Sequence, residues 1–142
     1  MIDENRKKHI FGVAEFLKEF AIESNLSEED CKDLYTLGLL HDIGYAFTNK
    51  ENQKDHNKIG GEILKKQGYK YWKEVYYHGI PNSPYQSRFL DLLNWADMHI
   101  DGYGNYATAQ ERLEDVSRRY NTKIEDLECA KIVEELKQKG LN

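Results

Sequence analysis

The sequence is poor in cysteine, in proline and in long apolar runs. Of its 142 residues only two are cysteines and two are prolines. Cys31 and Cys129 stand far apart and form no CxxC pair, which excludes a disulfide framework and favours a reducing cytoplasm. No apolar run approaches the roughly 20 residues of a membrane helix, and the charged N-terminus is unlike a signal or transit peptide. We therefore expect a cytoplasmic protein with no membrane partner.

A concentrated positive charge is also missing. The formal net charge is -5, and lysine and arginine gather in no long stripe of the kind that binds a nucleic-acid duplex. We expect no duplex partner. The hydrophobic share of 39% and the charged share of 32% are typical of a globular chain. The length suits one domain over residues 1–142.

Apolar residues recur at helical spacing along most of the chain, and no alternation is long enough to predict a sheet. The fold class predicted is therefore all-α, a compact single-domain bundle of about six to seven helices. Residues 5–105 would form its core, and the helices of 106–142 would pack on that core. The expected helices are 5–24, 27–44, 55–67, 69–78, 83–100 and two that follow Thr108 and Thr122.

Local signals suggest where these helices begin and end. Ser27 with Asp30, Thr108 with Glu111 and Thr122 with Glu125 are spaced like capping boxes. The Ser83–Gln86 segment, with proline at the first helical position, is read as another start. Gly44 and Gly68 are expected to end their helices. Residues 45–54 are read as a loop that could cover a site.

Four of the five histidines and two aspartates lie on or beside apolar helix faces. Such side chains are costly to bury without a partner, and a bound cation would suit all of them. Two imidazoles and two carboxylates leave room for water, a set that suits Zn, Fe, Mn, Co or Mg. This four-ligand set comprises His9, His41, Asp42 and Asp97. His56 and His78 could add a second ion, with Asp42 as the bridge.

Blander explanations exist for each residue alone. A single histidine on an apolar stripe is more often a hydrogen-bonded core residue than a ligand. Asp97 could equally cap a helix or pair with an arginine. His99 lies about 200° around the helix from Asp97 and should point away from an ion. Asp101 returns to the face of Asp97 and could orient a ligand or water behind the metal.

Aromatic and basic residues near these histidines are candidate substrate contacts. The tyrosines around His78, Tyr76 and Tyr77 above all, could stack a nucleobase, although such a run is more often core. Lys58, with Lys50 and Lys54, could contact phosphate, although a solvated helix start explains these lysines equally well.

The order His9, His41-Asp42, Asp97 resembles the H...HD...D signature of the HD-domain superfamily of metal-dependent phosphohydrolases. The resemblance covers about residues 5–105. His56 in HNKIGG resembles the HxxxGA-type helix start, and His78 resembles the further histidine of members that hold two metals. The resemblance implies an all-helical fold and hydrolysis of nucleotide phosphate esters or anhydrides. Small bacterial members with six ligands are similar to the symmetrical diadenosine tetraphosphate hydrolases.

Tyr45 departs from the family pattern, because many two-metal members have a lysine directly after the HDIG motif. No GYP signature follows, which disfavours a cyclic dinucleotide phosphodiesterase. The leading hypothesis is hydrolysis by metal-bound hydroxide. It needs one or two divalent ions (Fe, Mn, Zn, Co or Ni, with Mg as an alternative) and a small phosphorylated substrate such as a nucleotide.

Asp42 and His41 are the expected catalytic residues. Lys58, Tyr45 and Tyr77 are the expected substrate contacts. A homodimer is left open. The rival readings are a non-catalytic metal- and nucleotide-binding sensor or scaffold, and a structural helical protein.

Overall fold

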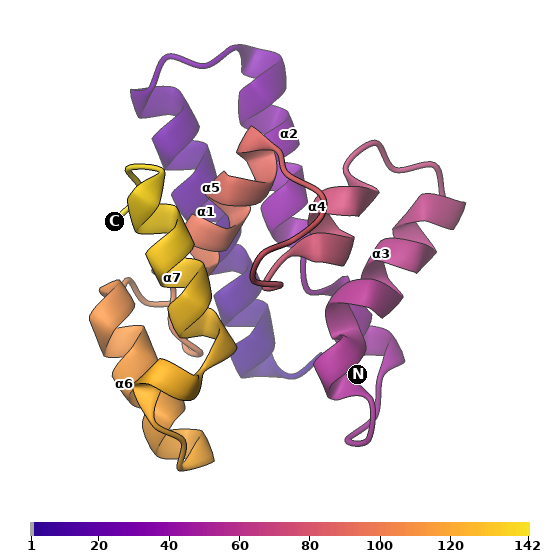
Figure 1. Cartoon of the computed structure of the whole chain (residues 1–142). Helices are drawn as coiled ribbons and strands as arrows, with labels where there is room; N and C mark the ends of the chain where they lie inside the picture. The colour runs from indigo at the N-terminus through magenta and orange to yellow at the C-terminus, as the bar shows by residue number, and fades with distance from the viewer. Residues whose placement is uncertain (1) are drawn as a thin grey trace.

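The computed structural model describes residues 2–142 and forms seven α-helices joined by short connections (Figure 1). Three 3-10 segments lie between them, and no strand occurs among residues 2–142. The all-α prediction is confirmed. The helices are α1 (Glu4–Glu23), α2 (Glu28–Leu40), α3 (His56–Lys66), α4 (Trp72–Tyr77), α5 (Arg88–Asp97), α6 (Ala109–Tyr120) and α7 (Glu128–Gln138).

The main core lies where α1 and α2 pack together and α5 crosses them (Figure 1). Val13, Leu37 and Leu93 are completely buried in it. Each such side chain stabilises the fold by roughly 1.5–3 kcal/mol through removal from water. Gly38 lets the two helices approach closely, because a Cβ there would lie 2.5 Å from the Cα of Ala14. The close packing of α1 against α2 fixes the position of His9 relative to the end of α2.

A smaller core lies between α6 and α7. Met98, Leu113 and Val133 belong to it, and Trp95 of α5 packs against both cores. In Figure 1 these two helices lie together on one side of the bundle, apart from α3 and α4. Because α5 contacts both cores, packing on two sides fixes the position of this helix and of its last residue, Asp97.

Three of the expected helix signals are confirmed. The Ser27 hydroxyl accepts from the Asp30 amide at 3.0 Å and opens α2. Thr108 and Glu111 form a complete capping box at α6. Gly68 follows α3 with a φ of +77°, which glycine tolerates and other residues rarely do.

Several helix boundaries differ from expectation. Helix α2 ends at Leu40, and Gly44 lies within a 3-10 turn, Ile43–Phe47, which spans the end of the expected helix and the start of the expected loop. A Cβ at Gly44 would lie 1.8 Å from the His56 carbonyl oxygen, so this glycine serves packing rather than helix termination. Thr122 does not start a helix, because a 3-10 turn, Ile124–Asp126, intervenes before α7.

Helix α5 begins at Arg88, later than the proline at position 84 suggests. Ser87 caps it by accepting from the Leu90 amide at 3.0 Å. The reason lies in tertiary contacts: the hydroxyls of Tyr85 and Ser87 each donate to the buried Glu74 carboxylate at 2.7 Å. These bonds hold the preceding segment in a non-helical path. Helix α4 is likewise shorter than expected and begins at Trp72.

None of the helices within residues 2–142 combines the length and apolar character that crossing a membrane requires.

Candidate metal centre

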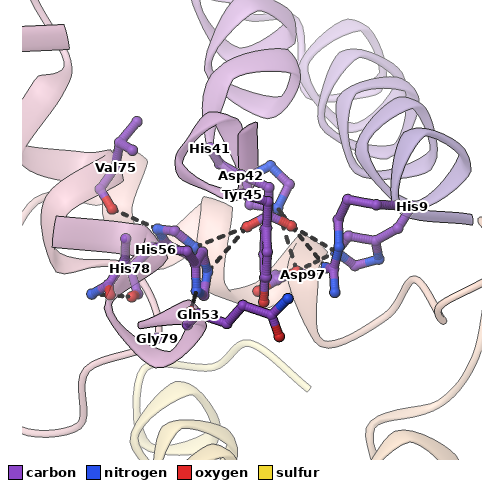
Figure 2. Close-up of polar contacts among 12 residues, drawn as sticks. His9, His41, Asp42, Tyr45, Gln53, His56, Val75, His78, Gly79 and Asp97 are labelled. Atoms are coloured by element: carbon purple, nitrogen blue, oxygen red, sulfur yellow. Dashed lines mark hydrogen bonds and ion pairs between the residues drawn. The ribbon is translucent and has the colours of Figure 1, made fainter. Parts of the chain in front are cut away.

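The six residues expected to bind metal meet in one place, mostly at helix ends (Figure 2). Only one of them lies in the interior of a helix. The others are brought together because the ends of α2, α4 and α5 and the start of α3 converge beside the first turns of α1. They are His9 in α1, His41 and Asp42 after α2, His56 at the start of α3, His78 after α4 and Asp97 at the end of α5.

Asp42 lies at the centre of the cluster. Its Oδ1 faces the Nε2 atoms of His56 and His78 at 3.3 and 3.4 Å. Its Oδ2 faces the Nε2 atoms of His41 and His9 at 3.3 and 3.8 Å. The two carboxylate oxygens therefore serve two halves of the cluster. This is the arrangement that a carboxylate shared by two ions would need.

Asp97 completes one half. Its Oδ1 lies 2.7 Å from His9 Nε2 and 3.5 Å from His41 Nε2. Two sets of three groups are compact enough to hold an ion, His9 with His41 and Asp97, and His41 with Asp42 and His78. His41 belongs to both. The side chain of Asp97 is 25% exposed, whereas that of Asp42 is 3% exposed, so Asp97 is the more open side of the cluster.

All four imidazoles are oriented by the backbone. Each donates from Nδ1 to a carbonyl oxygen: His9 to Asp101 at 3.0 Å, His41 to Gly38 at 2.6 Å, His56 to Gln53 at 2.9 Å and His78 to Val75 at 2.5 Å. With Nδ1 turned to the backbone, each Nε2 faces the carboxylates and could bind a metal ion in place of a proton. Metal-binding histidines are usually held this way by the nitrogen that does not bind the metal.

His41 shows that something positive belongs between these groups. Its Nε2 is buried and has no hydrogen-bond partner among the described residues, while two carboxylate oxygens lie 3.3 and 3.5 Å away. A lone pair beside two carboxylates is repelled unless a proton or a metal ion lies between them. The donor set of imidazoles and carboxylates fits a divalent transition metal.

The charges are strongly coupled. Burial would raise the pKa of Asp42, but the positive charge of His41 and the nearby imidazoles of His41, His56 and His78 hold it well below its usual range. Burial would lower the pKa of His41, yet Asp42 and Asp97 raise it well above its usual range. The nearby imidazole of His41 and the hydrogen bond from His9 likewise lower the pKa of Asp97, against the effect of burial. Without a metal, His41 keeps a proton that an ion would displace.

Arg6 also contacts the cluster and was not expected from the sequence. Its Nη1 lies 3.0 Å from Asp42 Oδ2. Its guanidinium carbon lies 4.1 Å from the centre of the Tyr45 ring, which in turn stacks on His56 with 4.1 Å between ring centres. Arg6 is three residues before His9 and so shares its helix face, which is the signal that could have revealed it.

A cavity of about 630 Å³ opens onto the cluster from the side of α3. His56, His78 and Asp97 line it together with Lys54 and Lys58. Lys58 therefore lies beside the opening onto the cluster. Tyr77 is not among the described residues that line this cavity; its ring packs against Tyr76 and Tyr85 instead.

The remaining candidates have defined places. Asp101 supports the cluster through its backbone carbonyl, which accepts from His9, while its carboxylate accepts from the amides of Tyr103 and Asn105. His99 points away from the cluster, as expected, toward the carbonyl oxygens of Ala107 and Asn142.

Two buried asparagines hold the loop that carries His78, and neither was expected from the sequence. The side-chain Nδ2 of Asn57 donates to the carbonyl oxygens of Tyr76 and His78 at 2.9 and 3.4 Å. The Asn94 side-chain oxygen accepts from the Gly79 amide at 2.9 Å. Helices α3 and α5 therefore both fix the path of the chain at His78.

The chain matches a known protein family. The HD domain matches residues 6–136, nearly the whole chain and all six residues of the cluster. The chain belongs to the HD-domain family. HD domains are typically metal-dependent phosphohydrolases, and this HD domain has the buried histidine and aspartate cluster that such chemistry requires. Comparisons with curated proteins and with solved structures give no match.

Proposed function

We propose that this HD domain is a metal-dependent phosphohydrolase that cleaves a phosphate ester or anhydride of a nucleotide or related small molecule. The observation that carries the proposal is the orphaned Nε2 of His41, buried against the carboxylates of Asp42 and Asp97. Family membership supports the same reaction class. The donor set suits one or two ions of Fe, Mn, Zn, Co or Ni, with Mg as an alternative.

A bound divalent ion supplies hydroxide at neutral pH, because it lowers the pKa of its water from 15.7 to about 7. Asp42 and His41 would hold the metal from the closed side of the cluster, and Asp42 can face two positions through its two oxygens. His9 and Asp97 would complete one position, and His56 and His78 the other. Each cleavage consumes one water: its oxygen joins phosphorus, and the leaving oxygen takes a proton.

Lys54 and Lys58 would attract the substrate phosphate, since both line the cavity that opens onto the cluster. The cavity wall also contains Ile80 and Pro81, which give an apolar surface for the organic part of a substrate. A dinucleoside tetraphosphate is one substrate of this class, in line with the resemblance to the symmetrical hydrolases.

The test is phosphate release from mononucleotides, dinucleoside polyphosphates and cyclic nucleotides, with each metal in turn. Asp42→Asn, which keeps the side-chain size, is the matched control. We expect metal-dependent turnover in the wild type and only background in Asp42→Asn. Equal turnover in both would contradict the proposal. Nucleotide binding without any turnover would identify a binding domain instead.

A further inference from the structure

Arg6 connects the cluster to a second cavity, separate from the one that Lys58 lines. This cavity, of about 430 Å³, lies between the start of α1, the 101–107 connection and the outer face of α6. Arg6 lines it while its guanidinium contacts Asp42. The inference drawn from this arrangement rests on the proposed function and concerns which substrates it takes.

Four arginines and four carboxylates line the second cavity, and the carboxylates already have partners within the chain. Asp3 accepts from the Arg6 amide, Asp101 from two amides of its own loop, and Glu111 from Thr108 in the capping box. The lining arginines are Arg6, Arg112, Arg118 and Arg119.

Arg112 differs from its neighbours. Arg118 and Arg119 both pair with Asp115, at 3.6 and 3.2 Å. The Nε of Arg112, by contrast, is buried and has no hydrogen-bond partner among residues 2–142. A buried guanidinium nitrogen without an acceptor is costly, and a phosphate oxygen is the acceptor whose geometry suits it best.

The Tyr45 stack keeps Arg6 in place. The flat contact with the ring at 4.1 Å and the bond to Asp42 leave the guanidinium little freedom to swing into solvent. Asp42, Asp97 and Arg6 together carry one net negative charge, so a single divalent ion would already make the centre positive. An anion would then be attracted to the side where Arg6 lies.

We propose that the substrate carries at least two phosphate groups: one bound at the cluster beside Arg6, and a further one in the second cavity with Arg112. Arg6 thus supplies the cation that a lysine at position 45 would provide, and Tyr45 holds it. A phosphomonoester with a single phosphate would leave Arg112 without an acceptor.

Calorimetric binding to the metal-loaded protein tests this without turnover. The probes are inorganic phosphate and diimidotriphosphate, a triphosphate analogue that resists hydrolysis. We expect Arg112→Gln to weaken diimidotriphosphate about tenfold and to leave phosphate unchanged. Arg6→Gln should weaken both probes about tenfold with the metal content unchanged. Arg88→Gln is the matched control, because that side chain is exposed and is not among the residues that line either cavity.

Two results would overturn the inference. One is wild-type affinity of Arg112→Gln for diimidotriphosphate. The other is an equal loss in Arg88→Gln, which would reduce the effect to general charge. Unchanged phosphate binding in Arg112→Gln also shows that this variant is folded. Failure of the proposed function would appear differently, as absent turnover of every substrate while the binding preference persists.

Discussion

Two buried histidines of this chain, His41 and His99, show what separates a candidate metal site from an ordinary core position. Their exposed fractions are 0% and 4%. Both ring nitrogens of His99 face backbone carbonyl oxygens, at 2.9 and 3.0 Å. His41 has such a contact only at Nδ1, and its Nε2 is left facing carboxylates. Burial alone therefore does not identify a ligand; the free nitrogen does.

The sharpest way to break this comparison is to change both residues in the same manner. We expect His41→Gln to lose stoichiometric metal and turnover, because His41 belongs to both groups that could hold an ion. His99→Gln should keep both and lose roughly 1–3 kcal/mol of stability through its unmatched buried groups. Metal analysis, phosphate release and denaturant unfolding measure the two effects. Equal metal loss in the two variants would refute the distinction.

The next largest effect is on pH dependence. Because the pKa of His41 is raised in the folded protein, an ion must displace its proton, and metal affinity should fall as pH falls, by up to about tenfold per unit. Titration of the metal at several pH values measures this. A metal affinity that stays constant between about pH 6 and about pH 8, a range that includes the ordinary histidine pKa of about 6.5, would contradict this prediction.

For the metal-free protein, we expect the free energy of unfolding to fall as the pH rises into the alkaline range, whereas metal affinity rises with pH. The raised pKa of His41 contributes stability below about pH 6.5, and that contribution is lost as pH rises through the folded-state value. The lowered pKa values of Asp42 and Asp97 contribute above about pH 4 and are lost in acid. Thermal melting with a chelator follows both limbs.

A smaller effect is expected from Asn57→Ala. The loop at His78 loses two hydrogen bonds, so His78 should be held less firmly and metal affinity should fall about tenfold. Asn94→Ala, which removes a bond to Gly79, is the companion variant. If Asn57→Ala lowers stability and leaves metal affinity untouched, the asparagine supports only the fold.

The smallest effect should come from a substitution in the first turn of α6, which belongs to the smaller core. Glu111→Ala breaks the capping box of α6 and should cost about 1 kcal/mol of stability. Metal content should not change, since Glu111 touches no member of the cluster. Denaturant unfolding and metal analysis of this variant set the baseline for the others, and a loss of metal would mean that α6 supports the cluster.

Much of this arrangement could be predicted from the sequence, because helical spacing is a local property. The apolar stripe around His9 and the apolar run before His41 are visible in the sequence, and their order predicted the convergence. The start of α5 could not be predicted, because Glu74 decides it from another helix by accepting from Tyr85 and Ser87.

The role of Gly44 also depends on distant packing, since the His56 carbonyl lies against it. Arg6 was missed for a related reason: its position three residues before His9 is visible in the sequence, but its contacts with Asp42 and Tyr45 span more than thirty positions. Spacing predicted which residues meet, whereas the contacts that orient them required the structure.

The most direct test of the central claim is the metal content of the purified chain, measured by elemental analysis beside His41→Gln and His99→Gln. We predict at least one transition-metal ion per chain in the wild type and in His99→Gln, and none in His41→Gln. A wild type without stoichiometric metal after incubation with Fe, Mn, Zn, Co or Ni would contradict the account.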